Sequence, residues 1–333
     1  MVLGMNNESI LKIHTPSELL DAIPALIGFR PTDSLVAVVV MNKLIYVTAR
    51  LDIEAIECSD GATWLAGKLT HDPDGNQLDN VGVYLVGYGE ADRATSAVRA
   101  MCEQLGNLTQ EALVVDGDKW WRLDDDQAHG HFVPKKGKMS RILAQDNPVM
   151  DSRDQLAGSV AAPTGAKEDQ MLQLVIDSLD LVPEEDPPLA GHRLVELMEA
   201  WHKGTTVTDT QFLSAAMTVS MGMARDEVWK ILTRTKAKEY LPFWKEVLLR
   251  TPHGVRTAAL AVTGIIAWIS GEGALMNICL EEAEATDPEY PLVDMLRHIS
   301  LGCLPPSYWE KMNPGLCKTS KPAPMRNNDL ARV

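Results

Sequence analysis

Charged and hydroxyl side chains gather where the loop GFRPTDS leads into the apolar run LVAVVV. The loop carries Arg30, Asp33 and Ser34, and the next strand pattern, LIYVTARLD, ends with Arg50 and Asp52. Guanidinium, carboxylate and hydroxyl groups in one place can bind an anion or support hydrolysis. The same groups can instead form an ion-paired corner that holds the loop. We favour the corner and keep the ligand site as the alternative.

A two-residue turn decides which of these side chains can meet. Asn42 and Lys43 separate two runs rich in β-branched residues, so they predict a hairpin. In a regular hairpin Asp33 lies opposite Asp52, and side chains two positions apart share a face. Asp33, Arg50 and Asp52 should therefore lie together, with Arg50 between two carboxylates. A guanidinium held between two carboxylates already has its hydrogen-bond and charge partners, which favours a structural role.

The same loop runs in the wrong direction for a phosphate site. A phosphate-binding loop follows a strand and opens a helix, whose free N–H groups hold the anion. GFRPTDS leaves a helix pattern and begins a strand pattern. We therefore exclude a nucleotide phosphate loop at this position.

A second candidate site follows the strand pattern VGVYLVGY, where Tyr88, Gly89, Glu90 and Asp92 join a strand to a helix. Ligands of open α/β sheets bind at such strand ends. The carboxylates of Glu90 and Asp92 would repel a phosphate unless a metal ion intervened. Acidic residues also suit the first turn of a helix, so helix capping is the structural interpretation, and it is the one we favour.

Metal-binding and catalytic patterns are weak in this sequence. The run DDDQAHGH places His129 and His131 after three aspartates, which suits zinc, iron or manganese, but the pattern frames no third ligand. The sequence has no G-x-S-x-G nucleophile elbow and no C-x-x-C pair. We therefore predict no catalytic residue and no cofactor, and we keep the two histidines only as weak metal candidates.

The elements that must position these residues fall into two blocks. Residues 1–125 alternate helix and strand patterns and predict a mixed α/β domain with hairpins, its helices packed on the sheet. Residues 126–167 have the proline, glycine and charge of a connector. Residues 168–310 repeat apolar positions at helical spacing and predict an all-α, tetratricopeptide-like domain. Residues 311–333 are polar, proline-bearing and locally basic, and we expect a disordered tail.

Composition and charge narrow the class of partner. The formal net charge is −15, and a field of that sign repels a phosphate backbone, so we do not expect nucleic-acid binding. The five cysteines lack paired spacing and predict free thiols in a reducing cytoplasm. The most apolar helix pattern, TAALAVTGIIAWIS, is too short for a membrane span, and the N-terminus lacks a signal-peptide pattern. We therefore expect a soluble, cytoplasmic protein.

Two stretches near opposite ends of the chain carry long motifs. One is LIGFRPTDSLV followed by ARLD, and the other runs from AWISGEGAL through DPEY to LGCLPP. Both resemble an uncharacterised family of actinobacterial and phage proteins that is known only as a domain of unknown function. The resemblance spans nearly the whole chain, although residues 124–250 match weakly. It implies kinship and no particular chemistry.

These observations lead to two functional hypotheses. The first is a non-enzymatic protein-interaction or regulatory protein, whose helical half binds another protein, a host factor if the gene is phage-borne. Trp120 and Trp121 should point to opposite faces of one strand, so we expect one to be exposed on a contact surface. The alternative is a small-ligand or nucleotide-binding or hydrolytic enzyme that uses the α/β domain. The sequence leaves the oligomeric state open.

Overall fold

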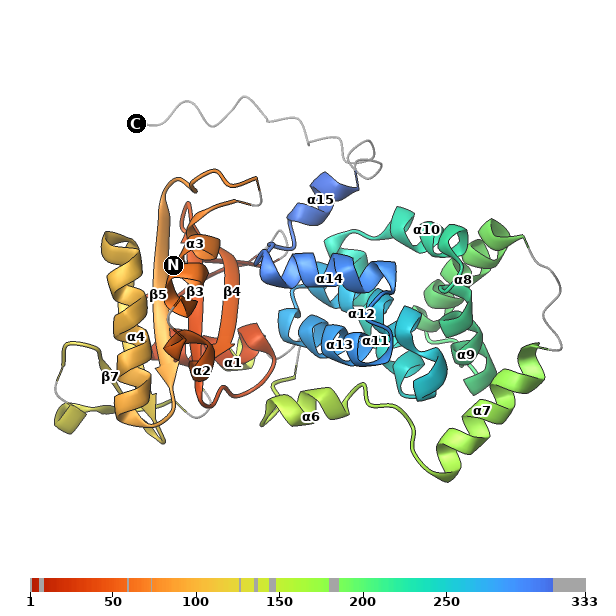
Figure 1. The fold of residues 1–333 in the computed structure, drawn as a ribbon, viewed down its shortest axis with the longest axis horizontal. Helices are drawn as coiled ribbons and strands as arrows, with labels where there is room; N and C mark the ends of the chain where they lie inside the picture. Colours follow the sequence, from red (N-terminus) through yellow and green to blue (C-terminus); the bar gives the residue numbers. More distant parts are fainter. Residues whose placement is uncertain are drawn as a thin grey trace.

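The computed structural model has an α/β half and a helical half (Figure 1). One apolar core cluster contains residues of both halves. It describes residues 2–5, 9–58, 60–72, 74–125, 127–134, 137–143, 148–179 and 186–313. The α/β half carries a mixed eight-stranded sheet in the order β2-β1-β4-β3-β5-β6-β7-β8. Its strands are β1 Val2–Met5, β2 Ser9–Lys12, β3 Ser34–Met41, β4 Leu44–Asp52, β5 Val81–Tyr88, β6 Thr109–Asp116, β7 Lys119–Arg122 and β8 His131–Phe132. The pairs β1–β4 and β5–β6 are parallel, and the other neighbours are antiparallel.

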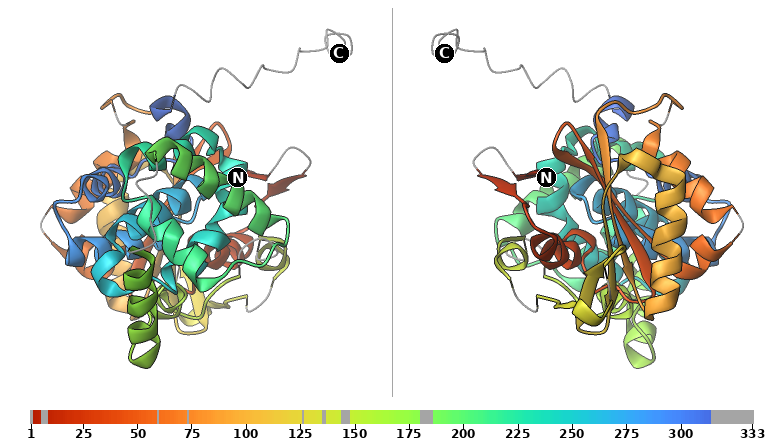
Figure 2. Two further views of the ribbon diagram at one scale, coloured as in Figure 1. Left: turned by 90° about the vertical axis from the view of Figure 1, so that its right-hand side faces the viewer. Right: turned by 90° about the vertical axis from the view of Figure 1, so that its left-hand side faces the viewer.

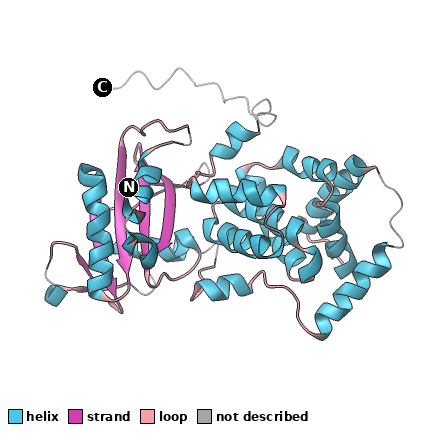
Figure 3. Ribbon diagram, viewed as in Figure 1, coloured by secondary structure: helices cyan, strands magenta, loops and turns pink. Residues whose placement is uncertain are grey.

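Helices cover both faces of the sheet and build the whole second half (Figures 2 and 3). They are α1 Pro16–Ile27, α2 Ile53–Glu57, α3 Gly61–Thr70, α4 Ala91–Leu105, α5 Lys138–Leu143, α6 Arg153–Gly158, α7 Ala166–Leu179, α8 Pro187–His202, α9 Asp209–Thr218, α10 Gly222–Ile231, α11 Arg234–Leu248, α12 Thr257–Ser270, α13 Gly273–Thr286, α14 Pro291–Leu301 and α15 Tyr308–Met312. The predicted fold class, a mixed α/β domain followed by a helical one, is confirmed. The tetratricopeptide-like arrangement stays a prediction, and α8 packs more closely on α10 than on its sequence neighbour α9.

Helix α1 shows how local sequence sets the boundaries of an element. Thr15 and Glu18 form a capping box, in which each side chain bonds the backbone N–H of the other residue. Pro24 lies inside the helix without ending it. Gly28 ends the helix in the left-handed conformation, with φ of 88°. The loop that carries Arg30 therefore starts from a fixed point.

The β3–β4 hairpin turns where the sequence predicts, at Asn42 and Lys43, which both have positive φ. Tyr46 is an extra residue in β4, and this bulge shifts the pairing by one position beyond Val39. Ser34 therefore lies opposite Asp52. The predicted register, which placed Asp33 there, is wrong because nothing in the hydrophobic pattern marks the bulge.

Strand β3 is buried on both faces. One face packs on α2, α3 and α4, and the other packs on α1 and continues into the core of the helical half. Trp120 joins the core on the α1 face and Trp121 joins the core on the α4 face, and each is 5% exposed. The two side chains point to opposite faces as predicted, but the expectation that one is exposed is wrong because both faces are covered there.

A buried arginine ties the connector to the helical half. Arg256 has no exposed surface, and its Nη2 donates to the carbonyl oxygen of Val160 at 2.6 Å. Its Nη1 lies 3.0 Å from Oε1 of Glu282 on α13.

No helix within the described residues is long and apolar enough to cross a membrane. Of the tail predicted at 311–333, the part from 314 onward lies outside the described residues.

Candidate functional site

The two sites predicted from sequence meet at the ends of β3 and β5. Ser34 lies opposite Asp52 of β4 and opposite Tyr88 of β5. Tyr88 lies opposite Val115 of β6, and Val115 lies opposite Trp120 of β7. Residues directly opposite each other in a sheet point to the same face. The strand ends therefore place Ser34, Tyr88 and Trp120 in one row on one face of the sheet.

Arg50 contacts the loop through a backbone carbonyl and pairs with one carboxylate of its own strand, β4. Its Nη1 lies 2.7 Å from Oδ1 of Asp52, and its Nη2 donates to the carbonyl oxygen of Thr32 at 3.2 Å. Its guanidinium also lies 5.9 Å from the centre of the Phe29 ring. Asp33 stands outside β3 in the left-handed conformation, with φ of 42°. The structure pairs Arg50 with Asp52 and not with Asp33, and its Nε is buried without a hydrogen-bond partner among the described residues. The predicted clamp between two carboxylates is therefore wrong, and the structural role of this corner stays a prediction.

Gly89 and Glu90 build the start of α4. Gly89 has φ of 143°, and a Cβ at this position would lie 3.0 Å from Oδ1 of Asp33. The carboxylate of Glu90 accepts hydrogen bonds from the backbone N–H groups of Asp92 and Arg93, at 3.2 and 3.1 Å. Two of the N–H groups that could hold an anion at this helix start are therefore engaged by the cap. The capping interpretation explains this loop.

A cavity of about 540 Å³ lies beside Tyr88, and we name it the strand-end cleft. Its walls come from α1, the GFRPTDS loop, the ends of β5 and β6, and the connector. The lining residues are Leu20, Asp21, Pro24, Arg30, Pro31, Tyr88, Val115, Gly117, Val133, Pro134, Ser140, Arg141, Pro148 and Val149. The wall is mostly apolar, with a few charged and hydroxyl groups, which is the usual composition of a small-molecule site.

Arg30 brings a weakly paired guanidinium to this cleft. Its Nε lies 3.7 Å from Oδ1 of Asp151, and the two side chains are 48% and 87% exposed. An exposed pair of this kind contributes about 0–1 kcal/mol. The backbone of Arg30 is held more firmly, because its N–H donates to the carbonyl oxygen of Met150 at 3.0 Å. The backbone of Arg30 is thus fixed at the cleft, whereas its guanidinium is half exposed and a ligand anion can compete for it.

A buried carboxylate on α1 holds the outer wall of the cleft. Asp21 accepts hydrogen bonds from the backbone N–H groups of Gly137, Met139 and Ser140, at 2.8, 2.9 and 3.1 Å. A Cβ on Gly137 would lie 2.1 Å from Oδ2 of Asp21, so this position requires glycine. The sequence analysis missed both residues. The one available signal was an aspartate within the apolar pattern LLDAIPALI.

Three polar groups of the strand row are buried without a hydrogen-bond partner among the described residues. They are Oγ of Ser34, Oη of Tyr88 and Nε1 of Trp120. A buried polar group left unpaired costs about 1–3 kcal/mol, so a cluster of them calls for an explanation. Burial raises the pKa of Tyr88 far above that of a free tyrosine, so its hydroxyl stays protonated and can donate. Of the three, Tyr88 lines the cleft.

The weak metal candidates lie near the far edge of the sheet. His131 stacks on Trp120, with ring centres 4.8 Å apart, and both His129 and His131 are exposed. Within the described residues, no group of three or more histidines, cysteines, aspartates or glutamates could hold a metal ion. One aspartate of the run DDDQAHGH, at position 126, lies outside them.

Comparison with known proteins matches the chain to one family model. The model is described as "Domain of unknown function (DUF4192)" and matches residues 16–307. The chain belongs to this family. The expected kinship with an uncharacterised family is therefore confirmed, and the DUF4192 span includes both halves of the structure and the strand-end cleft. No curated protein and no solved structure matches the chain.

The C-terminal motif of this DUF4192 chain makes packing contacts. The indole Nε1 of Trp268 donates to the carbonyl oxygen of Leu304 at 2.8 Å. The hydroxyl of Tyr290 accepts a hydrogen bond from Nη1 of Arg225 at 3.1 Å. Gly271 ends α12 in the left-handed conformation, with φ of 97°. Packing explains these residues, whereas the N-terminal motif borders the cleft.

Proposed function

We propose that this protein binds a small organic anion in the strand-end cleft. The observation that carries the proposal is the buried, unpartnered hydroxyl of Tyr88, a residue that lines the cleft together with the weakly paired Arg30. A guanidinium together with a neutral hydroxyl donor suits a carboxylate or a phosphate monoester. The cavity of about 540 Å³ is also of the size that small-molecule sites have.

The rest of the wall favours a ligand with an apolar body. Leu20, Val115, Val133 and the cleft prolines supply surface that a ring or a branched chain can cover. Burial of such a group contributes about 25 cal/mol per Å² of apolar surface. The ligand class is therefore an aromatic or branched molecule with one negatively charged group.

The proposed role is binding without catalysis at this site. The carboxylate of Asp21 already accepts three backbone N–H groups, and the hydroxyl of Ser140 donates to the carbonyl oxygen of Gly137 at 3.2 Å. A general base or a nucleophile must be available to the substrate. These bonds argue against the hydrolytic alternative for the cleft.

Calorimetric titration of the full chain tests the proposal with three probes: benzoate, phenyl phosphate and uncharged benzyl alcohol. We expect at least one anionic probe to bind saturably and benzyl alcohol to bind at least tenfold more weakly. Arg30→Gln should weaken the anionic probe about tenfold, which corresponds to about 1.4 kcal/mol. Tyr88→Phe should weaken it about fivefold, because one hydrogen bond is lost.

Arg99→Gln is the matched control for the charge change. Arg99 is an exposed arginine on α4, on the opposite face of the sheet from the cleft. This variant should bind as the unmodified chain does. Equal binding of charged and uncharged probes, or an Arg30→Gln variant that binds normally, would contradict the proposal, as would the failure of both anions to bind.

We infer a second role, in protein interaction, for the helical half. The observation that favours it is three exposed apolar side chains on or beside α8 and α10, two helices that pack on each other. Leu189 lies on α8, Met223 lies on α10, and Met221 is the N-cap of α10. Leu189, Met221 and Met223 are 47%, 37% and 60% exposed. A partner retained by the full chain should be lost from Met223→Glu and kept by Met312→Glu, which makes the same change on α15. Equal retention by both variants would contradict this role.

We also propose that the protein acts in the cytoplasm. Cys58, Cys102, Cys279 and Cys303 are free thiols, and Cys58 is exposed. Exposed free thiols persist in reducing compartments. Mass spectrometry of the protein isolated under thiol-blocking conditions should find these cysteines blocked, and disulfide-linked peptides among them would contradict the proposal.

A further inference from the structure

Helix α1 contains a proline where an α-helix normally supplies a backbone hydrogen bond. Pro24 lies inside α1, and the helix continues past it to Ile27. In a regular helix the N–H of residue 24 donates to the carbonyl oxygen of Leu20, four residues earlier, but proline has no N–H. Leu20 is 2% exposed, and a buried carbonyl without a donor costs free energy. The carbonyl oxygen of Leu20 therefore lacks its helical donor.

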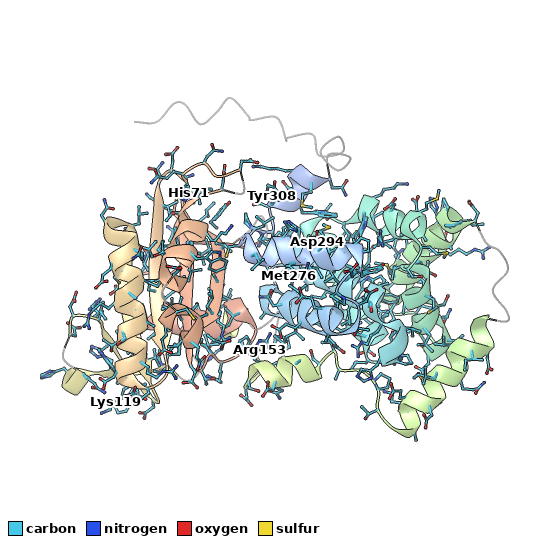
Figure 4. All side chains as sticks on the ribbon, viewed as in Figure 1. His71, Lys119, Arg153, Met276, Asp294 and Tyr308 are labelled. Carbon is cyan, nitrogen blue, oxygen red and sulfur yellow. The ribbon has the colours of Figure 1, made fainter. Side chains whose placement is uncertain are left out.

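This acceptor belongs to the α1 wall of the strand-end cleft. Leu20 and Pro24 lie one turn apart on one face of α1, and both line the cleft. A helical carbonyl points along the axis toward the residue four positions later, so the oxygen of Leu20 lies between them. Lys119, labelled in Figure 4, begins β7 just after Gly117, another residue of the cleft lining. It marks the end of the α/β half at which this acceptor lies.

The charges of the cleft decide which kind of donor fits. Among the described residues that line it, Arg30 and Arg141 are positively charged and Asp21 is negatively charged. The carboxylate of Asp21 already accepts three backbone N–H groups. Two positive groups against one negative group leave a positive excess, which an anionic ligand balances. A second, cationic group on the ligand would restore that excess, so a neutral hydroxyl fits better than an ammonium group.

We propose that the ligand of the strand-end cleft carries a hydroxyl group on its apolar body and that this hydroxyl donates to the carbonyl oxygen of Leu20. The inference rests on the anion binding proposed above and adds a second polar contact to it. Arg30 and Tyr88 contact the negatively charged group, and the backbone of α1 contacts the hydroxyl. The ligand class is therefore a hydroxylated aromatic or branched acid.

Calorimetric titration of the full chain with substituted benzoates tests the inference. The probes are benzoate, its 3-hydroxy and 4-hydroxy derivatives, and the matching methoxybenzoates, whose ether oxygen cannot donate. At least one hydroxybenzoate should bind about fivefold more tightly than benzoate, because it gains one hydrogen bond. Its methoxy counterpart should bind no more tightly than benzoate. If phenyl phosphate is the anion that binds, 4-hydroxyphenyl and 4-methoxyphenyl phosphate are compared with it in the same way.

The variant Pro24→Ala identifies the acceptor. Alanine restores the N–H at position 24, which then bonds the carbonyl oxygen of Leu20 within the helix, and alanine favours the helix, so the variant should fold. The advantage of the hydroxylated probe over the unsubstituted one should disappear, while both still bind. The ratio of the two affinities is the readout, because loss of the proline ring alters the wall for both ligands.

Pro242→Ala is the matched control, since it removes an exposed proline from inside α11. This variant should keep the advantage of the hydroxylated probe. If neither benzoate nor phenyl phosphate binds, the proposed function and this inference both fall. If an anion binds but no hydroxyl derivative gains, or the gain persists in Pro24→Ala, this inference alone is overturned. Tighter binding of 4-(aminomethyl)benzoate than of either hydroxybenzoate would also overturn it, because the preferred donor would then be a cation.

Discussion

Replacing Tyr88 with phenylalanine should stabilise the unliganded protein. The hydroxyl of Tyr88 is buried and has no hydrogen-bond partner among the described residues, while the ring packs in the core. Keeping such a group away from water costs about 1–3 kcal/mol, and phenylalanine preserves the ring while removing the group. Taking the lower end of that range, the free energy of unfolding should rise by about 1 kcal/mol. The melting temperature should rise by about 2 °C.

Tyr290→Phe is the matched control, because it removes the same hydroxyl group but should lower the free energy of unfolding instead of raising it. The hydroxyl of Tyr290 accepts a hydrogen bond from Arg225 at 3.1 Å. Loss of a bond to a charged group costs about 1.5 kcal/mol. In urea unfolding of the full chain, the midpoint urea concentration should therefore rise for Tyr88→Phe and fall for Tyr290→Phe. The slope of the unfolding free energy against urea concentration should be unchanged in both.

A loss of stability in Tyr88→Phe by 1 kcal/mol or more would refute the reasoning. It would mean that the hydroxyl is bonded in the native protein and that its role is structural. A ligand-binding group is expected to lower the stability of the unliganded protein and to strengthen ligand binding. Tyr88→Phe should therefore raise stability and weaken the binding of the anionic probe. The two measurements together separate a binding role from a packing role.

Three further perturbations test other parts of the structure. Glu282→Gln leaves the guanidinium of Arg256 buried without its charge partner, so the free energy of unfolding should fall by about 2–3 kcal/mol in urea. Gly137→Ala forces a Cβ against the carboxylate of Asp21 and should cost about 2 kcal/mol, with faster proteolysis of the connector. Burial raises the pKa of Cys279 to about 12, against 9.0 for an unperturbed thiol. Its proton is therefore lost more readily on unfolding, so stability should decline from pH 9 upward, and alkylation at pH 8 should spare Cys279 until the chain unfolds.

Local signals made the element boundaries readable from sequence. The capping box of Thr15 and Glu18 and the glycine stop at Gly28 act through bonds within a few residues, so their sequence pattern is sufficient. The hairpin turn at Asn42 and Lys43 is local in the same sense. These features fixed where α1 and the β3–β4 hairpin begin and end.

Features that depend on distant parts of the chain could not be read in this way. The bulge at Tyr46 leaves the hydrophobic pattern of β4 readable but moves every pair beyond it by one position. The outer wall of the strand-end cleft depends on a bond between Asp21 and Gly137, which are 116 residues apart. The candidate residues Arg30 and Tyr88 were each identified, but only the fold shows that they line one cavity.

The most direct test of the central claim is a crystal structure of the full chain grown with benzoate. The account predicts the carboxylate within hydrogen-bond distance, about 2.7–3.2 Å, of both the Arg30 guanidinium and the Tyr88 hydroxyl, with the ring against the apolar wall of the strand-end cleft. An empty cleft at a benzoate concentration that saturates binding in solution, or benzoate bound elsewhere, would contradict it.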